Sequence, residues 1–239
     1  MAQGKTEPPA RIKTLAVDIG GSGIKALLLD ESGNLLTTRS RVETPRPATP
    51  KAVLDVIAGL AKAQGLFERV SVGFPGVVRQ GVTVTAPNLD ASWQGYKLAA
   101  SLKRMLGKPV RVANDADVQG FGAIAGRGVE VVMTLGTGVG SALFVDGRLV
   151  PNLELAHHLF RKGMTYEEQL GNAALKKAGK EKWNSRLGKA IQALDALFTY
   201  DVLYLGGGNT KHIAIPLPAN VKIVPNVAGL LGGIFLWRE

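Results

Sequence analysis

Two glycine-rich turns are the first candidates for chemistry in this chain. The stretches 18–30 and 134–146 align without a gap, and in each an apolar strand runs through a glycine-rich turn into a second apolar strand that ends on Asp. This pattern is typical of a β-hairpin. Glycines allow several backbone N–H groups to face one small volume, and such an array binds phosphate oxygens. Two such turns predict that a phosphate chain is held from two sides.

A glycine turn by itself is more often a conformational feature than a binding site. The repeat changes this balance, because an internal duplication indicates two similar lobes, and ligands bind in clefts between lobes. Lys25 follows the first turn and suits either a phosphate contact or a solvated strand position. The candidate phosphate-binding residues are Gly20, Gly21, Ser22, Gly23, Lys25, Gly136, Thr137 and Gly138.

Alternating strands and helices must position these turns. In the first half we expect strands over 15–19, 24–29, 35–42, 70–74 and 110–113, a hairpin over 77–85, and helices over 51–63, 97–106 and 116–125. The second repeat begins near residue 131 with a meander that ends near 150. A helix-rich stretch follows, because 152–215 contains no proline, and it closes on a strand over 203–205. A buried last helix is expected over 226–237.

These elements predict an α/β fold of two related lobes around a central cleft. We expect a disordered leader over 1–13, an N-terminal lobe over 14–113 and a C-terminal lobe over 114–225. The last segment, 226–239, is expected to pack back toward the N-terminal lobe as a helix.

Composition narrows the functional classes. The chain has 239 residues, 46% of them hydrophobic, which is enough for a sizeable core. It has no apolar run long enough to cross a bilayer, and its N-terminus lacks the apolar core of a signal peptide, so we expect a cytoplasmic protein without a membrane partner. The absence of cysteine excludes disulfides and thiolate metal sites, and three histidines leave little room for zinc.

The formal net charge is +10, and the span 161–189 contributes half of it, with eight Lys or Arg against three Glu. The chain carries no motif typical of DNA or RNA recognition, so we expect no nucleic-acid partner. The span therefore suits either a solvated helix face or a track for an inorganic polyanion.

Five motifs in order resemble those of ROK-family sugar kinases, which have the actin-like ATPase (ribonuclease H-like) fold. Within that family the chain is most similar to the polyphosphate glucokinases, through Asn88–Gly95 and Phe144–Asn152. The resemblance covers about residues 14–239. The five motifs are Asp18–Lys25, Asn114–Asp117, Thr134–Gly140, Glu154–His157 and Leu205–Lys211.

The resemblance implies a kinase that transfers a phosphoryl group from inorganic polyphosphate, with ATP as a potential second donor, to the 6-hydroxyl of glucose. Asp115 would be the general base, although an Asp at this strand end also suits a helix N-cap. Asp18 would hold Mg²⁺ through water, although on the bare sequence it suits a turn Asp. Mg²⁺ is the expected cofactor, and zinc is not expected.

The same resemblance assigns sugar-binding and donor-binding residues. The sugar would contact Asn88, Asn114, Asp115, Glu154, His157 and Glu167, and the nucleotide or polyphosphate would contact Gly206, Gly207, Gly208 and Lys211. Whether Glu167 or Glu168 faces the sugar stays open, and Glu154 with His157 could instead be a surface pair. Ala156 stands where the family has glycine, which puts the His157 geometry in question if that position needs a positive φ.

The ligands expected are therefore glucose with polyphosphate, ATP or both, and relatives of this kind are commonly homodimers. Two alternatives stay open on the sequence: an ATP-only hexokinase for glucose, mannose or an amino sugar, and a sugar-binding pseudokinase.

Overall fold

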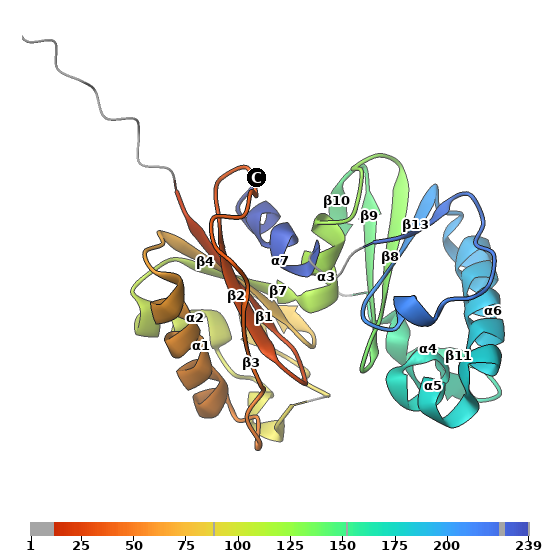
Figure 1. Ribbon diagram of the computed structural model, residues 1–239, viewed down its shortest axis with the longest axis horizontal. Coiled ribbons are helices and arrows are strands. Elements are labelled where there is room, and N and C mark those ends of the chain that lie inside the picture. Colours follow the sequence, from red (N-terminus) through yellow and green to blue (C-terminus); the bar gives the residue numbers. More distant parts are fainter. Residues whose placement is uncertain (1–11, 88, 152, 225–227, 239) are drawn as a thin grey trace, which may run out of the picture.

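The computed structural model describes residues 12–87, 89–151, 153–224 and 228–238. Most of the expected leader and Asn88 lie outside these ranges. The described chain forms two halves, each built on a five-stranded sheet (Figure 1). The first sheet has the order β3 (Ser40–Val42), β2 (Ile24–Leu29), β1 (Thr14–Ile19), β4 (Arg69–Phe74) and β7 (Val110–Asn114).

The second sheet repeats this arrangement. Its order is β10 (Arg148–Val150), β9 (Val139–Val145), β8 (Val129–Leu135), β13 (Val202–Gly206) and β14 (Val221–Ile223). In both sheets the first three strands form an antiparallel meander, and two parallel strands follow on the other side. The duplication predicted from the glycine-rich turns is therefore present in the topology.

Strand side chains alternate between two buried faces, which explains the continuous apolar runs. In β1, Leu15, Val17 and Ile19 face one core, whereas Ala16 faces another. In β8, Val131, Met133 and Leu135 face a third core, whereas Val132 faces a fourth. Each sheet is thus covered on both sides.

Helices α1 (Pro50–Gln64) and α2 (Leu98–Leu106) cover the outer face of the first sheet. Thr49 begins α1, since its side chain accepts from the N–H of Ala52 and Pro50 follows at the first helical position. The outer face of the second sheet is covered by α4 (Tyr166–Leu170), α5 (Asn172–Ala178) and α6 (Lys180–Phe198).

Helix α3 (Asp115–Phe121) lies between the two sheets, beside the C-terminal segment (Figure 1). Gly120 lets it pack tightly on β9, because a Cβ there would overlap the ring of Phe144. The helix ends four residues before the expected limit of 125. The buried carboxylate of Glu130 explains the short length, because it accepts the N–H groups of the next loop, residues 125–127, and holds them out of the helix.

Two other elements also differ from expectation. The strand expected over 35–42 is regular only over β3, with a single bridge between Leu35 and Leu29. The last segment is a short α7 (Ala228–Leu231) followed by a 3-10 turn, Gly232–Trp237, rather than one helix. The turn packs so closely on α3 that a Cβ at Gly232 would overlap the carbonyl of Val118.

The remaining elements are short. Strands β5 (Val78–Arg79) and β6 (Val82–Thr83) form the hairpin expected over 77–85. Strands β11 (Leu159–Arg161) and β12 (Met164–Thr165) form a second small hairpin. Short 3-10 turns lie at Ala91–Trp93, Leu155–His157 and Thr210–His212. Within the described ranges, no helix combines the length and apolar character needed to cross a membrane.

Candidate active site in the interlobe cleft

A cleft of about 610 Å³ opens between the two sheets. Both glycine-rich turns line it, together with the start of α3 and the segment that follows β13. The duplicated sheets thus bring segments that are more than a hundred residues apart in sequence to one space. The described cleft residues include Asp18, Gly20, Gly21, Ser22, Lys25, Asn114, Asp115, Gly136, Thr137, Gly138, Glu154, His157, Glu167, Gly207, Gly208 and Lys211.

In the first turn the carbonyl groups are bound from the protein side. Thr44 donates to Gly20 O at 2.5 Å, Arg46 to Gly21 O at 3.1 Å and Arg41 to Ser22 O at 2.9 Å. Among the described residues, no acceptor is hydrogen-bonded to the N–H groups of residues 21–23. With its carbonyls already satisfied, the turn has its amide donors free for an anion.

The second turn is arranged in the same way by neutral groups. Gly136 O accepts from the backbone of Asn172 at 3.0 Å and from the side chain of Asn209 at 3.0 Å. Thr137 O accepts from Asn172 N at 3.2 Å. No acceptor within the described ranges is bonded to the amides of Thr137 and Gly138. Two sets of free amide donors therefore border one cleft.

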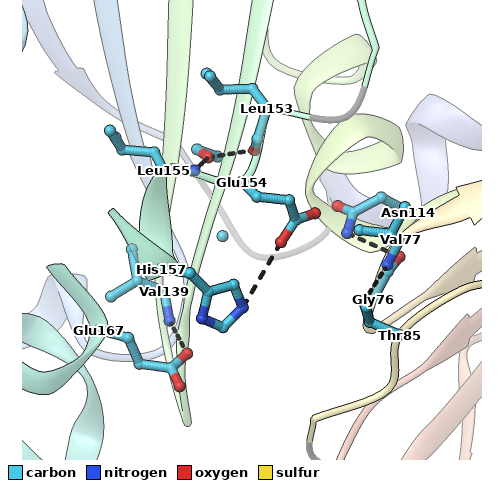
Figure 2. A network of polar contacts seen from close by, with 12 residues as sticks. Gly76, Val77, Thr85, Asn114, Val139, Leu153, Glu154, Leu155, His157 and Glu167 are labelled. Carbon is cyan, nitrogen blue, oxygen red and sulfur yellow. Dashed lines mark hydrogen bonds and ion pairs between the residues drawn. The ribbon is translucent and has the colours of Figure 1, made fainter. Parts of the chain in front are cut away.

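Asp115 is the first residue of α3, directly after β7, and Asn114 is its N-cap. The Asn114 side chain accepts from Ala116 N at 2.7 Å and donates to Gly76 O at 3.1 Å (Figure 2). The capping role therefore belongs to Asn114, whose amide keeps one N–H for another partner. Asp115 is left to direct its carboxylate into the cleft, with one oxygen accepting from Ala116 N at 2.8 Å.

Burial, and after it the nearby carboxylate of Asp18, raise the pKa of Asp115 to about 7. Burial and then the charge of Glu154 raise the pKa of Asp117 to about 7. The pKa of Glu154 is also raised, chiefly by its own burial. Such clustering of raised carboxyl pKa values is typical of sites that transfer protons near neutral pH.

Asp18 and Lys25 form an ion pair of 2.7 Å at the base of the first turn. They lie directly opposite each other in the β1–β2 ladder and both line the cleft. Among the described residues, no group of three or more His, Asp or Glu side chains is arranged to hold a metal. Asp18 presents one carboxylate to the cleft, and a Mg²⁺ ion bound beside phosphates commonly takes only one or two protein carboxylates, with water and phosphate as its other ligands.

The other end of the cleft carries Glu154 and His157, which are 3.7 Å apart between Oε2 and Nε2 (Figure 2). His157 ends a 3-10 turn that also contains Ala156. Ala156 is not among the residues with positive φ, so its Cβ causes no backbone strain here. Ser141 fixes this segment, accepting from Leu155 N at 3.2 Å and donating to Leu153 O at 2.7 Å.

The structure separates Glu167 from Glu168. Glu168 closes a capping box with Thr165 at the start of α4 and is exposed. Glu167 lines the cleft, and its Oε2 accepts from Val139 N at 3.1 Å (Figure 2). Glu167 is thus the one of the pair placed to meet a ligand, and it also supports the second turn.

At the far end of β13, Gly207 and Gly208 line the cleft with Lys211. Gly207 has a φ of +89°, and a Cβ there would overlap the carbonyl of Leu135, so only glycine fits. Gly206 does not line the cleft and instead lies against the side-chain amide of Gln119.

Sequence reasoning missed several cleft residues. Gln119 lines the cleft, and its Nε2 is buried without a hydrogen-bond partner in the described structure. Its position, one helical turn after Asp115, was the only available signal. Arg39 and Arg41 also line the cleft, whereas none of the cations of the span 161–189 is among the described lining residues.

The comparisons with known proteins agree with this geometry. The ROK family profile matches residues 14–153. A polyphosphate glucokinase of Mycobacterium tuberculosis (strain CDC 1551 / Oshkosh) is 35% identical over 233 residues, which cover 90% of this chain and 88% of that protein. A polyphosphate glucokinase of Mycobacterium leprae (strain TN) is 34% identical, covering 95% of this chain and 78% of that protein.

Solved structures show the same relationship. The inorganic polyphosphate/ATP-glucomannokinase from Arthrobacter sp. strain KM superposes with a TM-score of 0.84 at 34% identity, covering 94% of this chain and 97% of its own. A ROK family glucokinase from Streptomyces griseus, in complex with glucose and AMPPNP, has a TM-score of 0.76 over 94% of this chain and 98% of its own, and at 21% identity it shows the fold. The predicted actin-like ATPase fold is confirmed, and the chain belongs to the ROK family.

Proposed function

We propose that this protein is a glucokinase that transfers a phosphoryl group from inorganic polyphosphate, with ATP as a second donor, to the 6-hydroxyl of glucose. The observation that carries the proposal is the placement of two turns with free amide donors around a cleft that also holds Asp115. Phosphoryl transfer needs this combination of anion donors and a base. The names of the relatives support the choice of sugar and donor.

In the proposed reaction, the 6-hydroxyl oxygen of glucose attacks the terminal phosphorus of the donor. A P–O bond forms to the sugar, and the P–O bond to the next phosphate breaks, so the shortened donor leaves with the bonding electrons. The hydroxyl proton passes to Asp115. A pKa of about 7 suits this role, because the carboxylate is then available as a base near neutral pH and basic enough to accept the proton.

The two turns stabilise the charge on the phosphates during this transfer. The amides of residues 21–23 approach from the N-terminal lobe and those of Thr137 and Gly138 from the C-terminal lobe. Backbone donors held in place cost little reorganisation as charge shifts toward the leaving phosphate. Lys25 adds a positive charge beside the first turn, although Asp18 partly offsets it.

Asp18 would hold the magnesium ion, through water, beside the first turn. When bound, the ion would offset negative charge on the donor phosphates. Asp18 accepts from Lys25 through Oδ2. Lys25 would thereby orient the carboxylate toward the metal.

Glucose would lie at the end of the cleft that carries Glu154 and His157. Hydroxyl groups around a hexose need several fixed partners, and unpaired polar groups in such a site reject sugars that lack the matching hydroxyl. Glu154, His157, Glu167, Asn114 and Asp115 all line the cleft and would supply these partners. Asn88, the sixth expected sugar contact, lies outside the described residues.

The donor would extend from the turns toward Gly207, Gly208 and Lys211 when it is ATP, since glycines allow a flat base to approach closely. Gly206 would act indirectly, by leaving room for Gln119. We also propose that the protein forms a homodimer.

The test is glucose-6-phosphate formation from glucose and Mg²⁺, with long-chain polyphosphate or ATP as the sole donor. Product from polyphosphate supports the proposal, and a higher rate than with ATP would establish polyphosphate as the preferred donor. Product from ATP alone would contradict the polyphosphate assignment and favour an ordinary hexokinase. No product from either donor, with glucose binding still measurable by calorimetry, would favour a sugar-binding pseudokinase.

A further inference from the structure

Exposed arginines lie on the N-terminal lobe beside the first turn, on the opposite lobe from the basic span 161–189. Arg39 and Arg41 both line the cleft, and both are exposed. Arg41 lies opposite Lys25 in the β2–β3 ladder, and Lys25 lies opposite Asp18 in the β1–β2 ladder. Directly opposed residues share a face of a sheet, so one row leads from the carboxylate at the reaction centre to Arg41. Arg39 lies just before β3, two residues ahead of Arg41 in the chain, and also lines the cleft.

The guanidinium of Arg41 is hydrogen-bonded to the first turn. Its Nη2 donates to Ser22 O at 2.9 Å, and its Nε and Cζ would lie 2.6 and 2.8 Å from a Cβ at Gly23. Gly23 thus leaves the space in which the Arg41 guanidinium packs, and a Cβ there would displace it. An arginine held by one of its five N–H groups keeps the others for a second acceptor, and it loses little freedom when that acceptor binds.

Charge in the cleft is distributed unevenly. The acceptor end carries the carboxylates of Asp115, Glu154 and Glu167, which would repel a polyanion. The ammonium of Lys25 is already paired with Asp18. Arg39 and Arg41 are thus the cations on the N-terminal side of the cleft that no described carboxylate neutralises within salt-bridge distance.

We propose that Arg39 and Arg41 bind the trailing phosphates of a linear polyphosphate whose terminal phosphate lies between the two turns. The inference rests on the proposed function, because it concerns the donor of the same reaction. The planar guanidinium matches phosphate oxygens and stays charged at any working pH. A donor that ends in a nucleoside brings no such phosphates to this surface. The arginine pair therefore favours long inorganic chains over ATP.

The experiment is a chain-length series with the variants Arg39→Ala and Arg39→Ala/Arg41→Ala. Arg39 makes no hydrogen bond to the described part of the protein, so its removal tests ligand contact rather than folding. We expect the KM for long-chain polyphosphate to rise about fivefold in the single variant and more than about tenfold in the double variant, as for losing one or two charge-assisted contacts. In the single variant, the KM values for glucose and ATP should change by less than about twofold, because Arg39 makes no hydrogen bond to the described residues of the first turn.

Three control variants make the comparison specific. Arg104→Ala removes an exposed arginine of α2 that does not line the cleft and should leave every KM unchanged. Lys176→Ala/Lys177→Ala removes two exposed cations of α5 within the basic span 161–189. Lys211→Ala removes the cation at the nucleotide end of the cleft. Thermal unfolding of each variant verifies that it is folded.

A second readout is independent of turnover. Binding of fluorescently labelled polyphosphate, measured by anisotropy without glucose, should weaken with salt in the wild type, because exposed ionic contacts are screened. The slope against salt should decrease in the arginine variants. The inference would be overturned if the arginine variants kept the wild-type salt slope and the wild-type KM for long-chain polyphosphate. It would also be overturned if Lys176→Ala/Lys177→Ala or Lys211→Ala raised that KM more than the arginine variants do. If the wild type made no glucose-6-phosphate from polyphosphate, the donor assignment itself would be wrong, and the inference would fall with it.

Discussion

The two glycine-rich hairpins are nearly the same in sequence and differ by one residue in register. In the first, Ile19 pairs with Ile24, which leaves four residues in the turn. In the second, Leu135 pairs with Val139, which leaves three. A gapless alignment of the sequences therefore does not superpose the ladders. Because a slip of one residue sends each following side chain to the opposite face of a strand, the two hairpins present different residues to the cleft.

The consequence is clearest at the aligned positions Lys25 and Ser141. Lys25 opposes Asp18 and stays beside the phosphate-binding turn. Ser141 opposes Met133 instead of Thr134, and its hydroxyl bonds to the backbone on both sides of Glu154. One hairpin thus places an ion pair beside its own turn, and the other supports the segment that carries Glu154. The duplication gives both lobes the same sheet, and the difference in register decides which side chains each hairpin presents to the cleft.

The two turns also differ in the groups that hold their carbonyl oxygens. The carbonyls of the first turn are held by Arg41, Arg46 and Thr44, whereas those of the second are held by backbone and side-chain amides of Asn172 and Asn209. The first turn is thus held by two cationic side chains and a hydroxyl, and the second by neutral amides alone.

The largest expected effect concerns Asp115, which lines the same cleft as both turns. Asp115→Asn keeps the shape of the side chain and removes the base, so turnover should fall about 100-fold or more. Glucose binding, measured by calorimetry, should persist, because the turns and the other sugar contacts are intact. An unchanged rate would mean that Asp115 is not the base.

Replacing Asp18, before the first turn, should lower the rate more than replacing Thr134, which occupies the aligned position before the second turn. Asp18→Asn removes the carboxylate proposed for Mg²⁺, and the rate should drop more than about tenfold with a raised requirement for Mg²⁺. Thr134→Val removes an acceptor that binds Gly140 N at 3.1 Å, and the rate should fall only about threefold. Rates across a magnesium titration test this, and equal Mg²⁺ dependence in both variants would contradict the difference between the turns.

Register predicts that Lys25 and Ser141 affect different substrates. Lys25→Met should raise the KM for the phosphoryl donor about fivefold and leave that for glucose nearly unchanged. Ser141→Ala should raise the KM for glucose by a similar factor, since the Glu154 segment loses two hydrogen bonds. Steady-state kinetics with each substrate varied in turn provide the measurement. If both variants affected the donor, the one-residue shift would have no functional meaning.

The smallest effect is on stability and follows from the pKa of Asp115. Its folded value of about 7 lies above the ordinary 3.8, so between these values the folded protein binds more protons than the unfolded chain. Stability of the ligand-free protein should therefore fall as pH rises from about 4 to about 7. Asp115→Asn should raise Tm by a few degrees at pH 8 and by less at pH 5. Thermal unfolding at both pH values provides the measurement, and a variant less stable at pH 8 would contradict the pKa shift.

Much of this protein could be predicted from its sequence. The two turns, the order of strands and the two-lobe α/β fold follow from local signals, because glycine turns and apolar strands depend on neighbouring residues. The roles suggested for Asp115 and Asp18 came instead from the resemblance of five motifs, since each residue alone also fits a cap or a turn. Glu167 could not be distinguished from Glu168, because both lie in the first turn of α4 and only the capping box separates them.

Features that depend on distant contacts could not be predicted. The helix expected to reach residue 125 stops at Phe121, because Glu130 on the next strand holds the intervening amides. Arg39 and Arg41 looked like ordinary strand residues until β3 paired with β2 beside the first turn. The cations of the span 161–189 stood out in composition, yet none is among the described residues that line the cleft.

The sequence by itself thus determined that two glycine hairpins exist and that they belong to two similar lobes. Only the tertiary structure decided that the hairpins differ by one residue in register, so that Lys25 pairs with Asp18 whereas Ser141 bonds to the backbone on both sides of Glu154. The physical reason is that turn chemistry is local, whereas register is set by how each strand packs its buried side chains against the rest of its lobe.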